Sequence, residues 1–84
     1  MIEIFGKTQC PFCDKAKALC EKEGLEYTYS QLGDDFDRDY LFDQFPTART
    51  FPQIRVRDSE HSFIYIGGYD KLVEYVKHGD VWED

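Results

Sequence analysis

The feature that most constrains this chain is the run Cys10-Pro11-Phe12-Cys13, which separates two segments with different hydrophobic periodicity. Residues 1–6 (MIEIFG) alternate apolar and polar side chains, which predicts a short strand that ends at a glycine. Residues 13–23 carry apolar side chains at helical spacing, and Pro11 and Gly24 suit the start and the C′ position of a helix. The sequence therefore predicts that both cysteines lie at a strand-to-helix junction.

The remaining segments predict further strands and helices around that junction. We expect strands at 25–31, 53–57 and 62–66 and helices at 34–45 and 70–77. A helix joins the first two strands, which predicts a parallel pair with a right-handed crossover. The polar turn at 58–61 is so short that the strands on either side of it must pair antiparallel. The predicted order is βαβαββα, an α/β sandwich whose four-stranded mixed sheet is flanked by helices.

Length, composition and charge limit the classes of protein. At 84 residues with 42% hydrophobic side chains, the chain fits a single folded domain spanning 1–84. A net charge of −7 argues against binding to a nucleic-acid backbone, and the apolar run 63–66 is far shorter than the about 18 residues of a membrane span. The start lacks a secretory signal pattern, and three cysteines do not fit a disulfide scaffold. We therefore expect a soluble, cytoplasmic protein that binds neither nucleic acid nor membrane.

The spacing of Cys10 and Cys13 predicts redox chemistry. Cys10 comes before the first turn of the helix, where unpaired N–H groups and the positive end of the helix dipole lower the pKa of a thiol. Cys13 lies one turn inside, near enough to attack a mixed disulfide on Cys10. Lys7 adds a positive charge that favours the thiolate. The pair therefore predicts a nucleophilic Cys10 and a resolving Cys13.

The cysteines also allow a zinc site or two incidental thiols. A structural zinc site needs four ligands, and besides the pair the chain offers only Cys20, His61 and His78, with no second close pair. We therefore expect no metal. Cys20 falls near the apolar stripe of its helix, which favours a small buried side chain over a redox-regulatory role.

Three separated motifs, MIEIFGKTQCPFC, TFPQI and IGGYDKLVEYV, resemble those of the glutaredoxins, and the resemblance spans essentially the whole chain. The likeness is closest to short dithiol glutaredoxins of bacteria and bacteriophages. It implies a thioredoxin-like three-layer sandwich and an enzyme that reduces protein disulfides and glutathione mixed disulfides. It also implies glutathione as the reductant, with no tightly bound cofactor, and ribonucleotide reductase as one protein partner. We further expect a monomer, in the host cytoplasm if the protein is viral.

The resemblance assigns roles to individual residues. Cys10 matches the attacking thiolate and Cys13 the resolving thiol. The glutathione site is expected to comprise Lys7, Phe12, Thr50, Phe51, Pro52, Gly68, Tyr69 and Asp70. In the family, the bond before the proline that Pro52 matches is cis, and the backbone before it pairs with the cysteinyl unit of glutathione.

The expected pocket departs from the family near the last helix. The Gly67-Gly68 pair matches the segment that binds the γ-glutamyl carboxylate at a helix N-terminus. Lys71 stands where many members have an Asp that contacts the γ-glutamyl amine. Asp70 is expected either to take over that contact or to serve only as the N-cap of the helix. Arg49 and Gln44 are both candidates for binding the glycyl carboxylate.

Other functions stay open on the sequence alone. One is a thioredoxin-like donor reduced by a flavoprotein reductase, against which Lys7, Thr50 and the segment 67–70 favour glutathione. Another is an iron–sulfur cluster carrier, which Pro11 disfavours because cluster-binding relatives usually lack that proline. A non-catalytic interaction domain leaves the intact cysteine pair unexplained.

Acidic side chains gather in one predicted helix, at Asp34, Asp35, Asp37, Asp39 and Asp43. We expect a solvated helix face there. The alternative is a docking surface for a basic partner protein.

Overall fold

The computed structural model of the chain describes residues 1–60 and 62–78. Along these residues run β1 (Ile2–Gly6), α1 (Pro11–Lys22), β2 (Tyr27–Gln31), α2 (Arg38–Gln44), β3 (Gln53–Ser59), β4 (Ser62–Gly67) and α3 (Tyr69–His78). The predicted order βαβαββα is confirmed, because each apolar pattern has folded as its periodicity indicates.

One mixed sheet joins the strands in the order β2-β1-β3-β4. β1 pairs in parallel with β2, where Ile4 lies opposite Tyr29, and antiparallel with β3, where Ile4 lies opposite Ile54. β3 and β4 form the predicted antiparallel hairpin. The parallel pair, the hairpin and their union in one sheet are thus confirmed, and β1, which leads to Cys10, is a central strand.

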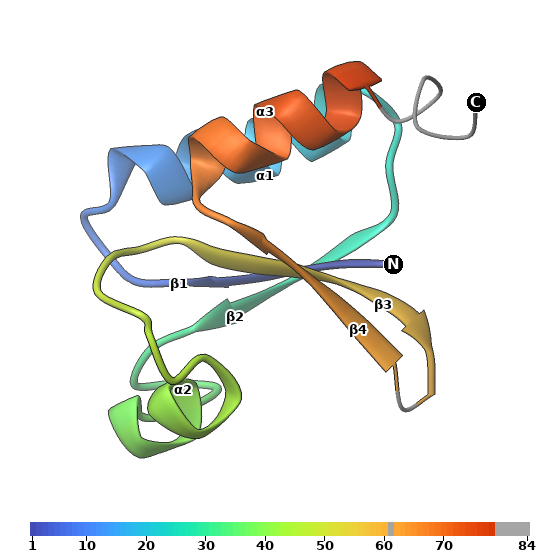
Figure 1. Cartoon of the computed structure of the whole chain (residues 1–84). Helices are drawn as coiled ribbons and strands as arrows, with labels where there is room; N and C mark the ends of the chain where they lie inside the picture. The colour runs from blue at the N-terminus through green and yellow to red at the C-terminus, as the bar shows by residue number, and fades with distance from the viewer. Residues whose placement is uncertain (61, 79–84) are drawn as a thin grey trace.

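The helices cover the two faces of the sheet unequally. In Figure 1, α1 and α3 lie side by side on one face, and α2 lies on the other face near one end of the strands. The core under α1 and α3 is built by Ile2, Ile4, Ala16, Cys20, Ile54 and Leu72. The core under α2 is built by Phe5, Leu41, Phe45 and Ala48. The expected three-layer sandwich is therefore present, and the prediction of a buried Cys20 is confirmed.

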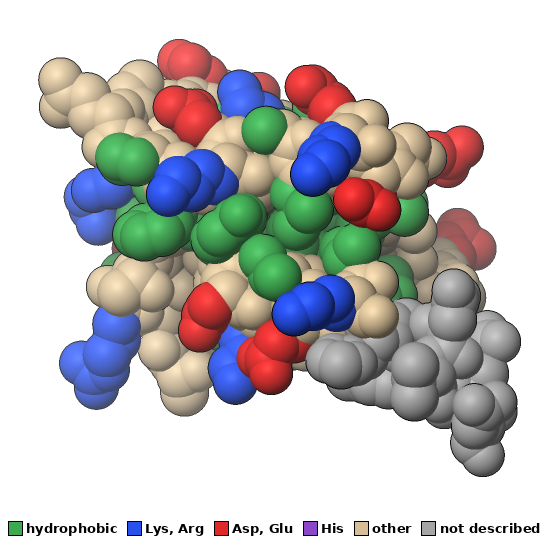
Figure 2. Space-filling view, turned by 90° about the horizontal axis from the view of Figure 1, so that it is seen from above, with side chains coloured by type: hydrophobic (Ala, Val, Ile, Leu, Met, Phe, Trp, Pro, Cys, Tyr) green, Lys and Arg blue, Asp and Glu red, His purple; other side chains and the backbone are tan. Residues whose placement is uncertain are grey.

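The outer surface over α1 and α3 keeps an apolar character. Figure 2 shows hydrophobic side chains in a band across this face, with charged side chains on both sides of the band. This pattern fits amphipathic helices whose apolar stripes meet each other and the sheet.

Alternation along β1 places a charged residue on the face that α2 partly covers. The isoleucines of β1 enter the core under α1 and α3, so Glu3 points to the opposite face, where it is only 6% exposed. Its carboxylate oxygens lie 2.6 Å from Arg55 Nε and 2.6 Å from Arg57 Nη2. Arg55 is also 6% exposed, and its guanidinium lies 3.9 Å from the centre of the Phe63 ring. This ion pair links β1 to β3.

Both of the first two helices differ from their predicted bounds. α1 begins at Pro11 rather than at residue 13, because Cys10 is the N-cap and proline suits the first helical position, where no N–H is needed. α2 begins at Arg38 rather than at residue 34. The Asp37 side chain caps it by accepting from the Tyr40 N–H at 2.8 Å.

The predicted single acidic helix face is therefore wrong. Residues 33–35 form a turn, in which the Asp35 carboxylate accepts from the Gln31 N–H at 2.7 Å. Asp34 and Asp35 lie in this turn and Asp37 is the N-cap, so only Asp39 and Asp43 of that set lie on α2. The acidic side chains shape the entry to the helix instead of forming one face of it.

β4 is an edge strand that exposes apolar side chains. Among the described strands it pairs only with β3, and Phe63, Ile64 and Tyr65 are 42%, 50% and 55% exposed. The apolar run noted in the sequence is thus part of a half-exposed strand. Within residues 1–60 and 62–78, no helix combines the length and the apolar character needed to cross a bilayer.

Candidate active site

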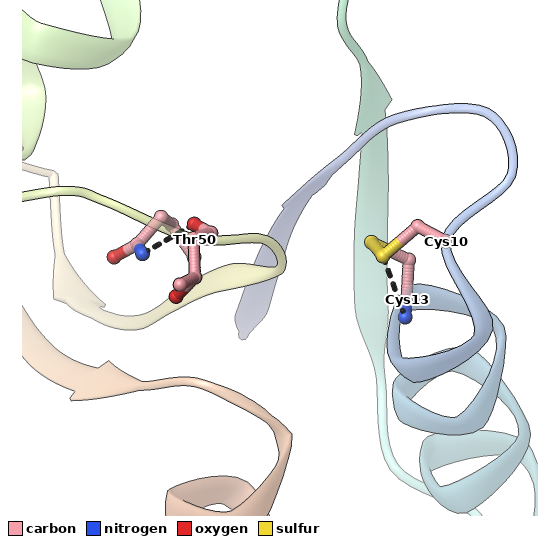
Figure 3. The surroundings of a disulfide bond; sticks show 4 residues. Cys10, Cys13 and Thr50 are labelled. Carbon is pink, nitrogen blue, oxygen red and sulfur yellow. Dashed lines mark hydrogen bonds between the residues drawn. A yellow bond between two sulfur atoms is a disulfide. The ribbon is translucent and has the colours of Figure 1, made fainter.

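Cys10 and Cys13 lie at the start of α1 and are joined by a disulfide (Figure 3). Their Cα atoms are 5.2 Å apart. Cys10 is the N-cap of the helix, and its Sγ accepts from the Cys13 N–H at 3.2 Å. Cys10 is 7% exposed and Cys13 is 0% exposed, so only Cys10 offers surface to a partner. The predicted strand-to-helix junction is confirmed.

The local sequence explains this placement of the sulfurs. Gln9 has a φ of 54°, which turns the chain from the loop after β1 into the helix. Pro11 has no N–H, and the first N–H groups of a helix have no partner within it. The N–H of Cys13 donates both to the Cys10 carbonyl at 3.1 Å and to Cys10 Sγ at 3.2 Å, and the second contact stabilises negative charge on that sulfur.

The loop before β3 lies across from the cysteines. Figure 3 shows Thr50 on this loop, and the Phe51–Pro52 peptide bond is cis, as the resemblance implied. Gln53 Nε2 donates to the Thr50 carbonyl at 2.6 Å, which ties the loop to β3. Lys7 Nζ lies 5.7 Å from the centre of the Phe51 ring, so the loop after β1 reaches the loop before β3.

A groove of about 380 Å³ brings together most of the residues expected to bind glutathione. Its lining residues are Phe12, Thr50, Phe51, Pro52, Gly68, Tyr69 and Asp70. The Phe12 and Tyr69 rings stack with centroids 5.9 Å apart, and Lys15 Nζ lies 5.1 Å from the centre of the Phe12 ring. Of the expected set, Lys7 alone is not part of the lining, and it borders the groove at Phe51.

Asp70 does not cap α3, so the expectation of an N-cap role is wrong. The helix begins at Tyr69, and the Gly68 carbonyl accepts its first intrahelical bond, from the Leu72 N–H at 3.0 Å. Asp70 is exposed in the first turn, and a Cβ on Gly68 would lie 3.4 Å from Asp70 Oδ1. The carboxylate therefore lies beside the glycine pair at the groove.

The two candidates for the glycyl carboxylate lie in different surroundings. Gln44 is engaged elsewhere, because its Oε1 accepts from Arg55 Nη1 at 2.8 Å in a second groove next to Phe63. Arg49 is exposed and directly precedes Thr50. Gln44 is therefore held away from the groove, whereas Arg49 adjoins the groove-lining Thr50 in sequence.

The zinc interpretation finds no support in the described part of the chain. Among residues 1–60 and 62–78 no group of three or more His, Cys, Asp or Glu side chains is placed to hold a metal ion. Cys20 is fully buried, and this burial, together with Glu21, raises the pKa of its thiol. His61 lies outside the described residues, as does the side chain of His78.

Sequence reasoning missed two residues close to the disulfide, Gly6 and Tyr29. A Cβ on Gly6 would overlap the hydroxyl of Tyr29 and would lie 3.0 Å from Cys13 Sγ. Burial, and to a lesser extent the Asp14 carboxylate, raises the pKa of Tyr29. Lys17 Nζ lies 4.4 Å from the centre of the tyrosine ring. The available signal was the glycine that ends β1, since a glycine at a strand end can mark a close approach.

Comparison with known proteins agrees with this geometry. A family model described as glutaredoxin matches residues 2–61. A probable glutaredoxin of Synechocystis is 35% identical over 72 residues, which cover 84% of this chain and 76% of that protein. The structure of reduced Escherichia coli glutaredoxin has 30% identity and a TM-score of 0.72, covering 92% of this chain and 93% of that one. A buckwheat glutaredoxin–glutathione complex has 28% identity and a TM-score of 0.68, covering 93% and 69%.

Proposed function

Because this chain belongs to the glutaredoxin family and is a thiol–disulfide oxidoreductase, we propose that glutathione is its reductant and Cys10 its nucleophile. The observation that carries this proposal is the groove beside the first turn of α1. It collects seven of the eight residues expected to bind glutathione, from α1, the loop before β3 and the start of α3. The buckwheat relative, whose structure is a glutathione complex, supports the same ligand.

In the proposed cycle, the Cys10 thiolate attacks one sulfur of a substrate disulfide. A bond forms between Cys10 and that sulfur, the substrate S–S bond breaks, and the other substrate sulfur leaves as a thiolate. Cys13 then attacks Cys10 Sγ, which forms the Cys10–Cys13 disulfide and releases the second substrate sulfur. Glutathione returns the pair to thiols in two exchanges, the first at Cys10. The 0% exposure of Cys13 supports this order, because an external thiol reaches only Cys10.

The charges of glutathione fit the residues around the groove. Glutathione carries two carboxylates and one ammonium. The N-terminal N–H groups of α3 suit the γ-glutamyl carboxylate, and Lys7 and Arg49 are the cations proposed for the glycyl end. Asp70 is the acid proposed for the ammonium, since Lys71 would repel it. We expect a positive potential in this groove despite the net charge of −7.

The cysteine roles are tested by reducing a disulfide substrate with glutathione and glutathione reductase. Cys10→Ser should be inactive, whereas Cys13→Ser should trap a mixed disulfide and keep single-thiol activity. Thioredoxin reductase replaces the glutathione system in a parallel reaction. Turnover with thioredoxin reductase alone would contradict glutathione as the reductant. Equal alkylation rates of both thiols over about pH 4–8 would contradict the assignment of Cys10 as nucleophile.

The contact between Asp70 and glutathione is tested by Asp70→Ala. The variant should weaken glutathione use by about 1–3 kcal/mol, the cost of an unpaired charge-assisted hydrogen bond, and should leave turnover with dithiothreitol nearly unchanged. Glu74→Ala is the matched control, because Glu74 is an exposed acid on the same helix outside the groove. If both substitutions raise the KM for glutathione equally, the effect is one of general charge and Asp70 has no specific contact.

We propose disulfide-containing proteins as the substrates, with ribonucleotide reductase as the partner that the family resemblance suggests, and the cytoplasm as the setting. Pro11, at the first position of α1, favours this dithiol chemistry over cluster carriage. Anaerobic reconstitution with iron and sulfide should therefore produce no visible absorbance.

A further inference from the structure

The hydroxyl of Tyr29 lies close to the inner cysteine of the pair, at the end of β1. Tyr29 is on β2, next to β1, and its hydroxyl occupies space where residue 6 would carry a Cβ if it were not glycine. That same missing Cβ would lie 3.0 Å from Cys13 Sγ. The hydroxyl and the inner sulfur therefore flank one small space at the end of β1.

The phenol is held in place and is protonated at neutral pH. Lys17 Nζ lies 4.4 Å from the ring centre, which holds the ring against α1. Burial, with a smaller effect of the Asp14 carboxylate, raises the pKa of Tyr29, so the hydroxyl keeps its proton. Within residues 1–60 and 62–78 no protein group pairs with this hydroxyl in the disulfide form, and since no buried side-chain polar atom there lacks a partner, the hydroxyl is open to water. A free O–H donor thus stands beside the sulfur of a fully buried cysteine.

We propose that Tyr29 is a positioning residue for the resolving step, in which its hydroxyl donates a hydrogen bond to Cys13 Sγ whenever that sulfur is a thiolate. The inference rests on the proposed role of Cys13 as the resolving thiol. Gly6 makes the contact possible, because any side chain at that position would separate the two groups.

The step balances without a further reactant. Cys13 gives up its proton, its thiolate attacks Cys10 Sγ of the mixed disulfide, and the Cys10–Cys13 bond forms. The bond between Cys10 and the substrate sulfur breaks, and the departing sulfur takes up a proton. Tyr29 keeps its own proton throughout, and its O–H···S contact replaces the water that a 0% exposed sulfur cannot reach. When glutathione later attacks Cys10, the same donor receives the Cys13 thiolate as the leaving group.

The size of the effect follows from the chemistry of thiolates. A donor that favours the thiolate raises its fraction, but it also lowers its nucleophilicity, with a Brønsted coefficient of about 0.4–0.5. A tenfold increase in the thiolate fraction therefore gives a net increase in rate of about threefold, and a hundredfold increase gives about tenfold. Removal of the hydroxyl should slow the resolving step by a factor of about 3–10.

The experiment compares Tyr29→Phe with Tyr27→Phe, the same substitution two residues earlier on β2. The Tyr27 hydroxyl donates to Glu21 Oε2 at 2.5 Å on the exposed side of α1, so it serves as the matched control. Rapid-quench alkylation and mass spectrometry follow the mixed disulfide on Cys10 as it forms and then decays to the Cys10–Cys13 disulfide. We expect decay about 3–10 times slower in Tyr29→Phe, and wild-type decay in Tyr27→Phe.

The pH profile separates this role from a loss of packing. If the hydroxyl stabilises the Cys13 thiolate, the profile of the resolving rate in Tyr29→Phe moves to higher pH, whereas looser packing lowers the rate equally at every pH. Equal decay rates in the two variants, or a slower rate without a moved profile, would overturn the inference. If the mixed disulfide of the wild-type protein never decays to the Cys10–Cys13 disulfide, Cys13 is not the resolving thiol. That outcome contradicts the proposed function itself and is distinct from a failure of Tyr29 alone.

Discussion

Removal of the charge on Glu3 tests whether the ion pair across the sheet stabilises the fold. In Glu3→Gln, Arg55 keeps its charge in a place where it is only 6% exposed, while Arg57 reaches water because half of its side chain is exposed. Removing one partner of a buried pair costs about 3–5 kcal/mol. Arg55 retains its bond to Gln44 Oε1 and the face of the Phe63 ring, so we expect the low end of this range, about 3 kcal/mol.

Urea unfolding of the oxidised protein measures this loss as a lower midpoint at an unchanged m-value. The matched control is Glu74→Gln, which removes the ion pair with Lys71 at 3.5 Å between side chains that are about 60% exposed. Exposed pairs of this kind contribute little, so the control should lose at most about 0.5 kcal/mol. If Glu3→Gln costs no more than Glu74→Gln, the buried carboxylate does not stabilise the sheet.

Further predictions concern the cysteine side of the sheet. Gly6→Ala should lower the free energy of unfolding by about 1–3 kcal/mol in urea titrations, because its methyl group would overlap the Tyr29 hydroxyl; unchanged stability would show that the space is larger than described. Cys20 in the reduced native protein should be alkylated far more slowly than in urea, as followed by mass spectrometry, because it is fully buried; equal rates would contradict this. Since burial raises the pKa of the Cys20 thiol, the unfolded chain ionises first, and stability should fall as pH rises past about 9. Cys20→Ala should lack this component of the fall.

The elements of the fold could be predicted because, in most segments, the hydrophobic periodicity agrees with the prolines and glycines that mark where an element begins and ends. Pro11 and Gly24 bracket α1, and Gly24 has the left-handed φ of 69° that suits its C′ position. The start of α2 could not be read from periodicity. Asp35 and Asp37 resemble helix residues in composition, yet their carboxylates bind backbone N–H groups, one in a turn and one at the cap. Local hydrogen bonds between a side chain and the backbone do not alter the hydrophobic periodicity of the sequence, so they cannot be read from it.

The site could be predicted where a motif marks it and not where only packing does. The cysteine pair, the cis proline loop and the glycine pair each stand out as short motifs, and all border one groove or the first turn of α1. Tyr29 and Lys15 carry no motif, because their neighbours come from strand pairing and from the rotation of α1. Gln44 lies near the loop before β3 in sequence and was therefore a candidate for binding glutathione, but its side chain is held by Arg55 in the second groove.

The Cys10 side chain is at once the nucleophile proposed for the reaction and the group that caps α1. Its sulfur accepts from the Cys13 N–H. The free energy by which the helix N-terminus stabilises the Cys10 thiolate is, by thermodynamic reciprocity, equal to the free energy by which the thiolate stabilises the helix. Each chemical event at this sulfur is therefore also a change in how the first turn is held. A substitution that frays the start of α1 should alter reactivity without touching the groove, and a reagent that consumes the thiolate should loosen the helix from its first residue.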